Sequence, residues 1–280
     1  MTSAFAKILL ITKEGHEQAK ELAGTVRSWL QKQGIDSVIW PNERGNDFPL
    51  DSFSADLVLV LGGDGTILSV ARNLDLSSRI PLLGLNLGRV GFLTELSPQR
   101  WGEDLDRILR GDFILSSQIV LSYFLERDGE IIRSGKVIND LVVGRSGLAR
   151  LIGMTLWYGS EELGELRADG MIISTPIGTT AYAAAAGGAL LTPDLRAMEV
   201  CPVSPFLSRF PPLILGSDQT LTIEVAQNSS KAILTLDGQV GFGMQGGDRV
   251  HVKEADIPLY FVRLPSGSYI QKLRSRGYLT

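Results

Sequence analysis

The sequence has little of what several kinds of functional site need. Its 280 residues include one cysteine, Cys201, and two histidines, His16 and His251. A single cysteine excludes a disulfide within one chain and a zinc site built from several cysteines. A histidine-dependent triad or a histidine-rich metal site would have to use one of the two histidines. Both fit a surface or strand-edge position better, so we expect a carboxylate to carry out any proton transfer.

The charge and the apolar runs exclude further classes. The formal net charge of −4 argues against the broad basic face of a nucleic-acid-binding protein. A small anionic ligand stays possible, because it needs only a few local arginines or lysines. No stretch approaches the roughly 18 apolar residues of a membrane span, and the N-terminal apolar run is too short for a signal peptide. We therefore expect a cytoplasmic protein with no nucleic-acid partner and no membrane partner.

The first part of the chain alternates strand-like and helix-like segments. A buried strand is expected at 7–13, further strands at 36–40, 57–61 and 80–86, and helices at about 19–33, 66–73 and 98–111. Strands that alternate with helices predict βαβ units and a mostly parallel sheet. We assign residues 1–112 to an α/β domain with a Rossmann-like parallel sheet.

The pattern changes near residue 113. Residues 119–144 alternate between apolar and polar with period two and contain Asp128-Gly129, a hairpin turn signal. Further short strands with turn residues between them follow, so residues 113–265 are predicted to form a β-rich domain. Residues 266–280 have a helical pattern, for which packing back on the first domain is one arrangement that the sequence allows.

A glycine cluster, GGDGT at 62–66, follows the third expected strand. It is not a Walker P-loop, and it lacks a Rossmann fingerprint because Leu68 occupies the third glycine position. One interpretation is a tight strand-to-helix turn with Asp64 as the helix N-cap. The other is a ligand site, because Gly62 and Gly63 remove side chains where a ligand would approach the backbone.

The charge of Asp64 restricts what such a ligand site does. Two like charges about 4 Å apart repel by about 1 kcal/mol in water and by several times more at lower dielectric. A carboxylate among phosphates must therefore meet a cation or a proton. It either binds Mg²⁺ through water or acts as general base for a hydroxyl that attacks phosphorus, and both roles belong to phosphoryl transfer.

The glycine cluster resembles the GGDGT motif of a superfamily that includes NAD kinases, phosphofructokinases, and diacylglycerol and sphingosine kinases. Four further segments make most of the chain resemble the NAD kinase family. They are NLGRVGFLTE (86–95), NDLVVG (139–144), LRADGMIISTPIGTTAYAAAAGG (166–188) and LTLDGQ (234–239). The resemblance implies a phosphofructokinase-like α/β domain and a β-rich domain. It also implies transfer of the γ-phosphoryl group of ATP to the 2′-hydroxyl of the adenosine ribose of NAD, with Mg²⁺ or another divalent cation, in a homo-oligomer (dimer or tetramer).

The resemblance also implies roles for individual residues. Asp64 would be the general base, and the phosphates would be bound by Gly63, Gly65 and Thr66. The residues implied to bind NAD are Asp64, Gly65, Asn139, Asp140, Arg150, Arg167, Asp169, Ile177, Thr180, Ala181, Tyr182, Ala185 and Gln239. No residue is assigned as a direct metal ligand.

Several of these positions have a structural alternative. Asn139-Asp140 also fits a strand-end turn, and Asp169 a simple Asp-Gly turn. Tyr182 and Phe92 also fit core aromatic positions, and Arg150 with Arg167 also fits a solvated surface.

The chain departs from the family pattern at a few positions. Ile177, Ala183 and Ala185 stand where relatives often carry hydroxyl residues, and Phe206 stands where they often carry histidine. Each lost hydrogen bond is worth about 0.5–1.5 kcal/mol, or nothing where water substitutes. The choice between NAD and NADH, and between ATP and polyphosphate, stays open. A non-catalytic NAD(P)-binding regulator and a lipid kinase of the same superfamily are the alternative functions.

Overall fold

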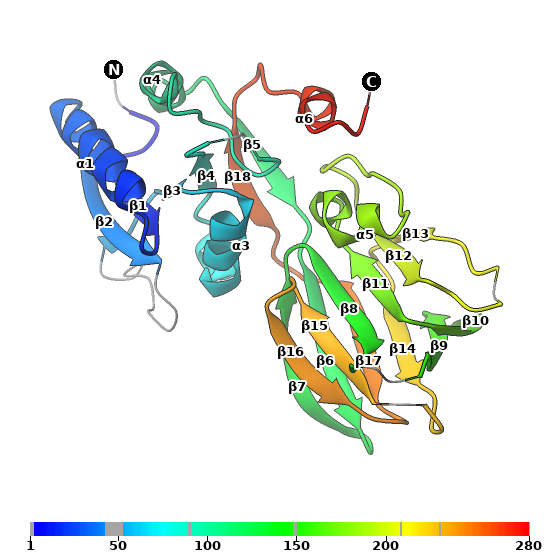
Figure 1. Ribbon diagram of the computed structural model, residues 1–280. Helices are drawn as coiled ribbons and strands as arrows, with labels where there is room; N and C mark the ends of the chain where they lie inside the picture. The colour runs from blue at the N-terminus through cyan, green and yellow to red at the C-terminus, as the bar shows by residue number, and fades with distance from the viewer. Residues whose placement is uncertain are drawn as a thin grey trace. The chain divides into compact units, whose positions relative to one another are not determined.

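The computed structural model describes residues 3–42, 53–88, 91–147, 150–207, 209–229 and 231–279. Arg89 and Val90 of the 86–95 segment lie outside the described residues. The chain divides into two compact units (Figure 1). Unit 1 consists of Met1–Gln118 and Leu259–Thr280, and unit 2 of Ile119–Pro258.

Unit 1 contains a six-stranded sheet in the order β2-β1-β3-β4-β18-β5. Its strands are β1 (Lys7–Lys13), β2 (Asp36–Asn42), β3 (Leu57–Leu61), β4 (Leu82–Leu85), β5 (Ile114–Gln118) and β18 (Leu259–Arg263). Neighbouring strands are parallel from β2 to β18, and β5 alone pairs antiparallel. Helices α1 (Glu17–Lys32), α3 (Asp64–Asn73), α4 (Trp101–Leu109) and α6 (Tyr269–Ser275) and the 3₁₀ turn η1 (Leu76–Ser78) complete the unit. The predicted parallel α/β sheet is confirmed.

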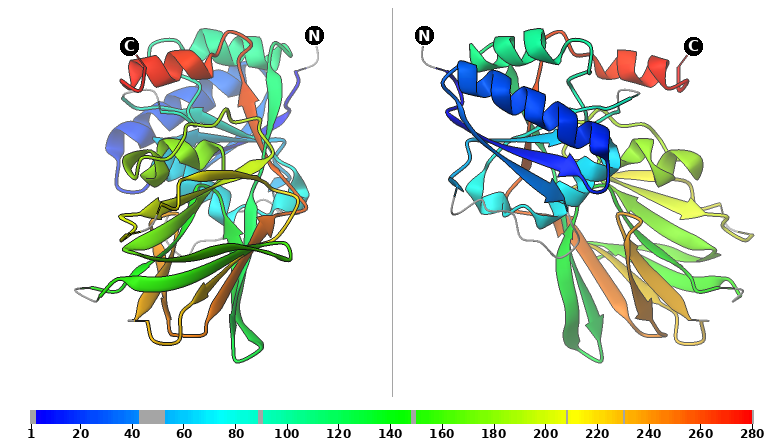
Figure 2. Two further views of the ribbon diagram at one scale, coloured as in Figure 1. Left: turned by 90° about the vertical axis from the view of Figure 1, so that its right-hand side faces the viewer. Right: turned by 60° about the vertical axis from the view of Figure 1, so that its left-hand side comes forward.

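Helix α1 shows how the sequence pattern produces this packing. Ala19, Ala23, Val26 and Leu30 are its buried residues, and they lie on one face that packs against the sheet (Figure 2). His16 is the N-cap, and its Nδ1 accepts a hydrogen bond from the backbone N–H of Ala19 at 3.3 Å. One of the two histidines is therefore used to begin a helix.

Unit 2 contains two six-stranded sheets in which every recorded strand pairing is antiparallel. The first has the order β10-β9-β14-β17-β6-β7 and the second β13-β12-β11-β8-β15-β16. The first sheet comprises β6 (Leu121–Arg127), β7 (Glu130–Val137), β9 (Ile152–Tyr158), β10 (Glu161–Ala168), β14 (Leu221–Val225) and β17 (Arg249–Glu254). The second comprises β8 (Asp140–Arg145), β11 (Gly170–Ser174), β12 (Ala197–Val203), β13 (Leu213–Gly216), β15 (Ala232–Leu236) and β16 (Val240–Met244). A 3₁₀ turn, η2 (Ile177–Thr180), and the short helix α5 (Tyr182–Ala185) follow β11.

The core of unit 2 takes apolar side chains from both sheets. Leu121, Tyr123 and Leu125 of β6 are buried at alternate positions, and Met171 and Ile173 of β11 join the same cluster. This period-two pattern is what the sequence showed after residue 113. Asp128 and Gly129 form the predicted hairpin turn between β6 and β7, with φ values of 51° and 83°.

The boundaries between the units lie at 118/119 and 258/259, whereas the sequence pattern places them at 112/113 and 265/266. β5 and β18 pair with each other, and Phe261 of β18 lies opposite Leu82 of β4, so both strands belong to the sheet of unit 1. Alternation identifies a strand but not the sheet that it joins, because its partners are distant in sequence. The tail helix α6 belongs to unit 1. Within the described ranges, no helix has both the length and the apolar character needed to cross a membrane.

Candidate functional site

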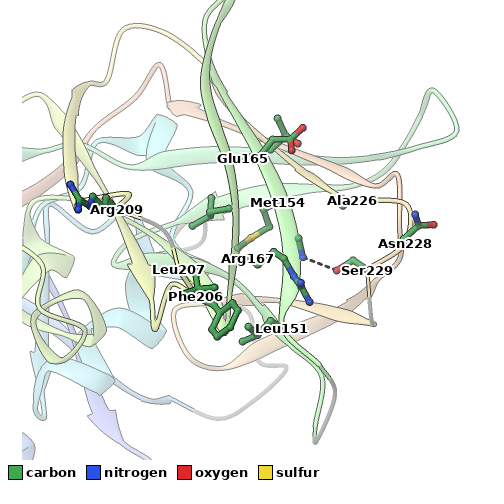
Figure 3. A pocket seen from close by; sticks show the side chains of 13 residues that line it. Leu151, Met154, Glu165, Arg167, Phe206, Leu207, Arg209, Ala226, Asn228 and Ser229 are labelled. Carbon is green, nitrogen blue, oxygen red and sulfur yellow. Dashed lines mark hydrogen bonds between the residues drawn. The ribbon is translucent and has the colours of Figure 1, made fainter.

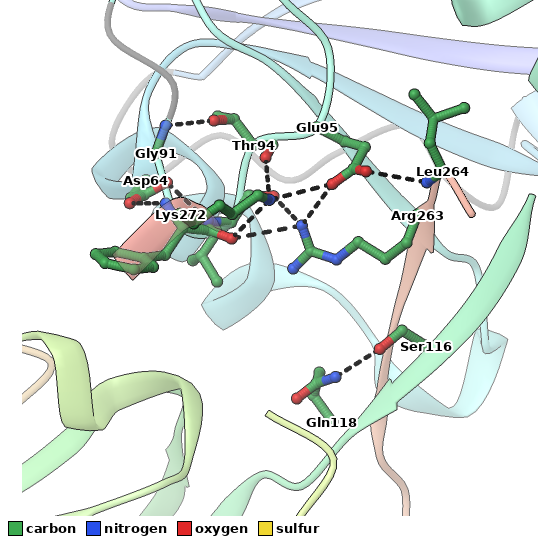
Figure 4. Close-up of polar contacts among 11 residues, drawn as sticks. Asp64, Gly91, Thr94, Glu95, Ser116, Gln118, Arg263, Leu264 and Lys272 are labelled. Atoms are coloured by element: carbon green, nitrogen blue, oxygen red, sulfur yellow. Dashed lines mark hydrogen bonds and ion pairs between the residues drawn. The ribbon is translucent and has the colours of Figure 1, made fainter. Parts of the chain in front are cut away.

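The glycine cluster connects a fully buried strand to a helix. All five residues of β3 are buried, and α3 begins at Asp64 with Gly63 as its N-cap. The Asp64 side chain does not cap this helix. One carboxylate oxygen accepts the backbone N–H of Phe92 at 2.9 Å, and the other accepts that of Leu93 at 3.0 Å (Figure 4). The N-cap interpretation of Asp64 is therefore wrong.

The loop that holds Asp64 requires a glycine. A Cβ atom at Gly91 would overlap both carboxylate oxygens of Asp64. The backbone N–H of Gly91 donates to Oγ1 of Thr94 at 2.6 Å, which closes the turn that contains the two donating residues. Hydrogen bonds from backbone N–H groups to a carboxylate are worth about 1.5–3 kcal/mol each, so Asp64 is held in one place.

The glycines of the cluster differ in their surroundings. A Cβ at Gly62 would meet the Thr66 side chain, so the absent side chain of Gly62 makes room for packing within the unit. A Cβ at Gly63 or Gly65 would meet nothing within 4 Å. Thr66 is buried, and its backbone N–H donates to the carbonyl of Gly63 at 3.0 Å. Gly63 and Gly65 thus leave open space at the start of α3.

A largely buried ion cluster lies beside the loop. The Glu95 carboxylate is within 3.3 Å of Arg263 and 3.1 Å of Lys272, and these three side chains are only 4%, 17% and 18% exposed. Burial lowers the pKa of Arg263 and of Lys272, and the negative charges of Glu95 and Asp64 oppose that shift. Sequence reasoning missed both cations, because their partners lie 168 and 177 residues away and leave no local signal.

A second group of candidate site residues lies in unit 2, around a cavity of about 440 Å³. Its lining consists of Asn139, Asp140, Val142, Ala181, Tyr182, Thr235, Asp237 and Gly238. Four of the residues predicted to bind the dinucleotide are therefore brought together. Tyr182 is 46% exposed, so the alternative that it is a core aromatic is wrong.

Asp237 holds the Asn139-Asp140 turn in place. Its Oδ1 accepts the backbone N–H groups of Asn139 at 2.7 Å and of Ile138 and Asp140 at 3.2 Å. Its own N–H donates to the carbonyl of Asp140 at 2.8 Å, and its φ is 46°. Sequence reasoning singled out only Gln239 in this segment. The Asp-Gly pair directly after an alternating strand was the available signal.

The Asp140 carboxyl has an unusual pKa. Burial raises it, and the negative charge of Asp237 raises it further, to about 6. Asp140 is 5% exposed and faces the cavity with Asn139. The Asn139 Oδ1 atom is buried and accepts no hydrogen bond within the described part of the chain. The cavity therefore presents a carboxyl and an amide oxygen that a bound ligand could satisfy.

The segment after β11 packs tightly on this turn. The carbonyl of Asn139 accepts the N–H of Thr175 at 2.8 Å, and a Cβ at Gly178 would overlap that carbonyl. Ile177 is 6% exposed, whereas Ala185 at the end of α5 is exposed. Thr180 closes η2, with its hydroxyl donating to the carbonyl of Ile177 at 3.3 Å. These three predicted residues lie near the cavity lining in sequence but do not belong to it.

The remaining predicted residues lie elsewhere in unit 2. Asp169 pairs with Arg145 at 3.0 Å, directly before β11. Arg167 lines another cavity, of about 730 Å³, together with Phe206 and Arg209 (Figure 3). Gln239 is exposed in the turn between β15 and β16, and Arg150 is also exposed. Their predicted contacts with a dinucleotide stay predictions.

The second histidine, His251, and the single cysteine, Cys201, both lie in strands of unit 2. His251 stacks on Phe124 at 4.3 Å between ring centroids, and burial lowers its pKa. Cys201 is buried, which raises the pKa of its thiol to about 11. In the ranges that the structure describes, no group of three or more His, Cys, Asp or Glu side chains is placed to hold a metal ion.

Comparisons with known proteins agree across both units. Residues 48–113 match the family model of the ATP-NAD kinase N-terminal domain, and residues 138–264 match that of the ATP-NAD kinase C-terminal domain. The NAD kinase of Nitratidesulfovibrio vulgaris (strain Miyazaki F) is 42% identical over 280 residues, which cover 100% of this chain and 99% of the relative. The NAD kinase of Geotalea daltonii is 34% identical, with 96% and 97% covered.

Two solved structures share the fold. An NAD kinase from Archaeoglobus fulgidus in complex with ATP superposes with a TM-score of 0.74 at 22% identity, covering 96% of this chain and 98% of that chain. A yeast NADH kinase complexed with NADH superposes with a TM-score of 0.81 at 21% identity, covering 96% of this chain and 86% of that chain. The similarity extends over both units.

Proposed function

The chain belongs to the NAD kinase family and is a kinase, and on that premise we propose that it transfers the γ-phosphoryl group of ATP to the 2′-hydroxyl of the adenosine ribose of NAD, giving NADP. The observation that carries the proposal is the placement of Asp64, whose carboxylate is fixed by two backbone N–H groups at the start of α3. A carboxylate has about four acceptor positions, so two stay available for a hydroxyl proton.

In this reaction the 2′-oxygen attacks the γ-phosphorus as Asp64 takes the hydroxyl proton. A phosphorus–oxygen bond forms to the ribose, the bond from the γ-phosphorus to the bridging oxygen breaks, and ADP leaves. The backbone N–H groups of Phe92 and Leu93 hold the acceptor oxygens in a fixed direction. Catalysis by this chain is then mostly positioning, which is usual for phosphoryl transfer.

The unit 2 cavity supports binding of the dinucleotide. Asp140 presents a carboxylate that accepts two ribose hydroxyl protons, and the Asn139 Oδ1 accepts an amino proton of adenine. Ala181 leaves space beside the Tyr182 ring, which provides a flat surface for a base. The NADH complex of the yeast relative, which shares this fold, agrees with a dinucleotide ligand.

The start of α3 supports binding of phosphate groups. Gly63 and Gly65 leave open space there, and the N-terminus of a helix favours negative charge. The ATP complex of the Archaeoglobus relative agrees with ATP as the donor. Mg²⁺ usually keeps several waters and binds substrate phosphates, so bound ATP and water would hold the cation and Asp64 would stay free to accept the hydroxyl proton. When bound, the cation neutralises phosphate charge.

Product analysis of the wild-type protein tests this function. Purified protein is incubated with NAD or NADH, crossed with ATP·Mg²⁺ or polyphosphate, and the 2′-phosphate of the product is identified by ³¹P NMR. We expect NADP from NAD and ATP, and none without the divalent cation. NAD binding by calorimetry with no NADP formed from any donor would instead support a non-catalytic regulator, and phosphorylation of a lipid hydroxyl would support a lipid kinase.

A further inference from the structure

Two largely buried cations, Arg263 and Lys272, lie behind the peptide groups that hold Asp64. Lys272 Nζ donates to the carbonyl of Phe92 at 3.2 Å and to that of Thr94 at 2.7 Å. Arg263 Nη1 donates to the carbonyl of Leu93 at 3.1 Å (Figure 4). Lys272 belongs to α6, 180 residues away from Phe92, and Arg263 ends β18. The loop is thus held on one side by cations and presents N–H groups to a carboxylate on the other.

The carbonyl of Phe92 and the N–H of Leu93 belong to one peptide group. Lys272 donates to that carbonyl, and that N–H donates to Asp64 at 3.0 Å. A cation at the carbonyl end polarises the peptide group and strengthens the bond made at its N–H end. The effect is larger here than in water, because Lys272 is only 18% exposed.

The charges of this cluster balance. Arg263 and Lys272 face the carboxylates of Glu95 and Asp64, and each cation is influenced by both acids. Burying an ammonium group is costly unless it is paired and hydrogen-bonded. Lys272 meets that condition with two carbonyls and one carboxylate. A helix that served only to cover the loop would need apolar contacts alone, such as the one that the Tyr269 ring makes with the Phe92 ring, 6.2 Å between centroids.

We propose that Lys272 is a positioning residue for the reaction, whose ammonium group orients and polarises the peptide group that holds Asp64. The inference rests on the proposed role of Asp64 as general base. It assigns to α6 a direct part in the geometry of the reaction centre. Arg263 donates to the next carbonyl, that of Leu93, at 3.1 Å and at a longer 3.5 Å to that of Phe92, and it is held by Glu95.

Steady-state kinetics of Lys272→Met test the proposal. We expect kcat to fall about tenfold, with the KM values for ATP and NAD changed less than twofold, because the change acts on the base and not on the bound substrates. Lys272→Arg, which keeps the charge and the donors, is expected to recover most of kcat. Arg274→Met is the matched control, since Arg274 is exposed on the same helix, and its kinetics are expected to equal wild type.

Hydrogen exchange of the 91–96 segment, followed by mass spectrometry, is a readout that does not depend on turnover. We expect the Leu93 amide, whose peptide group carries the carbonyl bound by Lys272, to exchange several times faster in Lys272→Met than in wild type and Arg274→Met. If Lys272→Met does not fold, Lys272→Gln gives the same comparison, because its amide donates to the carbonyls without the charge. Wild-type kcat in a folded neutral variant overturns the proposal, and so does a lower kcat with unchanged exchange. If wild type makes no NADP, the proposed function fails, and the exchange rates still decide whether Lys272 supports the bonds to Asp64.

Discussion

The pKa of Asp140 leads to a quantitative prediction for NAD binding. Burial and the charge of Asp237 raise that pKa from 3.8 to about 6. With a pKa of about 6, Asp140 is about 90% ionised at pH 7 and about 10% ionised at pH 5. If the ionised carboxylate accepts the ribose hydroxyls, the Kd for NAD should rise about tenfold between pH 7 and pH 5.

Asp237→Asn separates the charge of Asp237 from its hydrogen bonds. All three turn residues donate to Oδ1 of Asp237, an acceptor that asparagine keeps, and only the second bond from Ile138, to Oδ2 at 3.3 Å, is lost. The substitution removes a negative charge that raises the pKa of Asp140, so the midpoint of the binding curve should move to lower pH. Asp128→Asn in the β6–β7 hairpin is the control and should leave the midpoint unchanged.

Calorimetric titration with NAD at pH 5, 6 and 7 measures this effect. A Kd that stays constant over this range would refute the assignment of Asp140 as a ribose ligand. An unchanged midpoint in Asp237→Asn, with the protein folded, would show that Asp237 does not set the charge state of Asp140.

Three further predictions concern Asp140, Gly91 and His251. Ionising Asp140 opposes folding above pH 3.8, and most strongly above about pH 6, because its pKa is raised in the folded protein. Asp140→Asn should therefore stabilise the ligand-free protein at pH 7 by about 1–3 kcal/mol and weaken NAD binding. Thermal melts with and without NAD measure both effects. Gly91→Ala should lower kcat at least about 100-fold, because the added methyl group displaces the Asp64 carboxylate. Gly102→Ala is the control, because its methyl group meets nothing within 4 Å and should leave kcat unchanged. Equal kcat values in the two variants would contradict the described packing of the loop. Burial lowers the pKa of His251, so below about pH 6.5 the unfolded chain binds a proton at this residue more readily than the folded chain does. The free energy of unfolding should therefore fall towards pH 5 more steeply in wild type than in His251→Gln, as urea melts at several pH values would measure.

The sheet of unit 1 shows what local pattern determines. The four predicted strands are all present. β1, β3 and β4 are apolar because a parallel strand inside the sheet is buried on both faces, whereas β2 is an edge strand and only partly buried. The pattern could not assign β5 and β18, since a strand with one exposed face looks the same in either unit. Their assignment depends on pairing with β4 and with each other across more than a hundred residues.

Candidate residues could be singled out from the sequence where a motif places polar groups next to each other. Asp64 was singled out as a carboxylate among glycines, and the structure places Asn139 and Asp140 in the lining of the unit 2 cavity. The contacts that fix these groups were not predictable. Asp237 holds its turn from 97 residues away, and Lys272 reaches the Asp64 loop from 180 residues away. Such contacts depend on tertiary packing, which no short segment encodes.

The central claim is that Asp64 takes the proton of the attacking hydroxyl. The most direct measurement is the single-turnover rate of NADP formation in Asp64→Asn at saturating NAD and ATP·Mg²⁺. Asp56→Asn is the matched control, because Asp56 also accepts two backbone N–H groups in unit 1, from Ala6 and Lys7 at 2.8 and 2.9 Å. We predict a loss of about 10²–10⁴-fold in Asp64→Asn with the Kd of NAD within a few-fold of wild type, and no loss in Asp56→Asn. A near-normal single-turnover rate in Asp64→Asn would contradict the account.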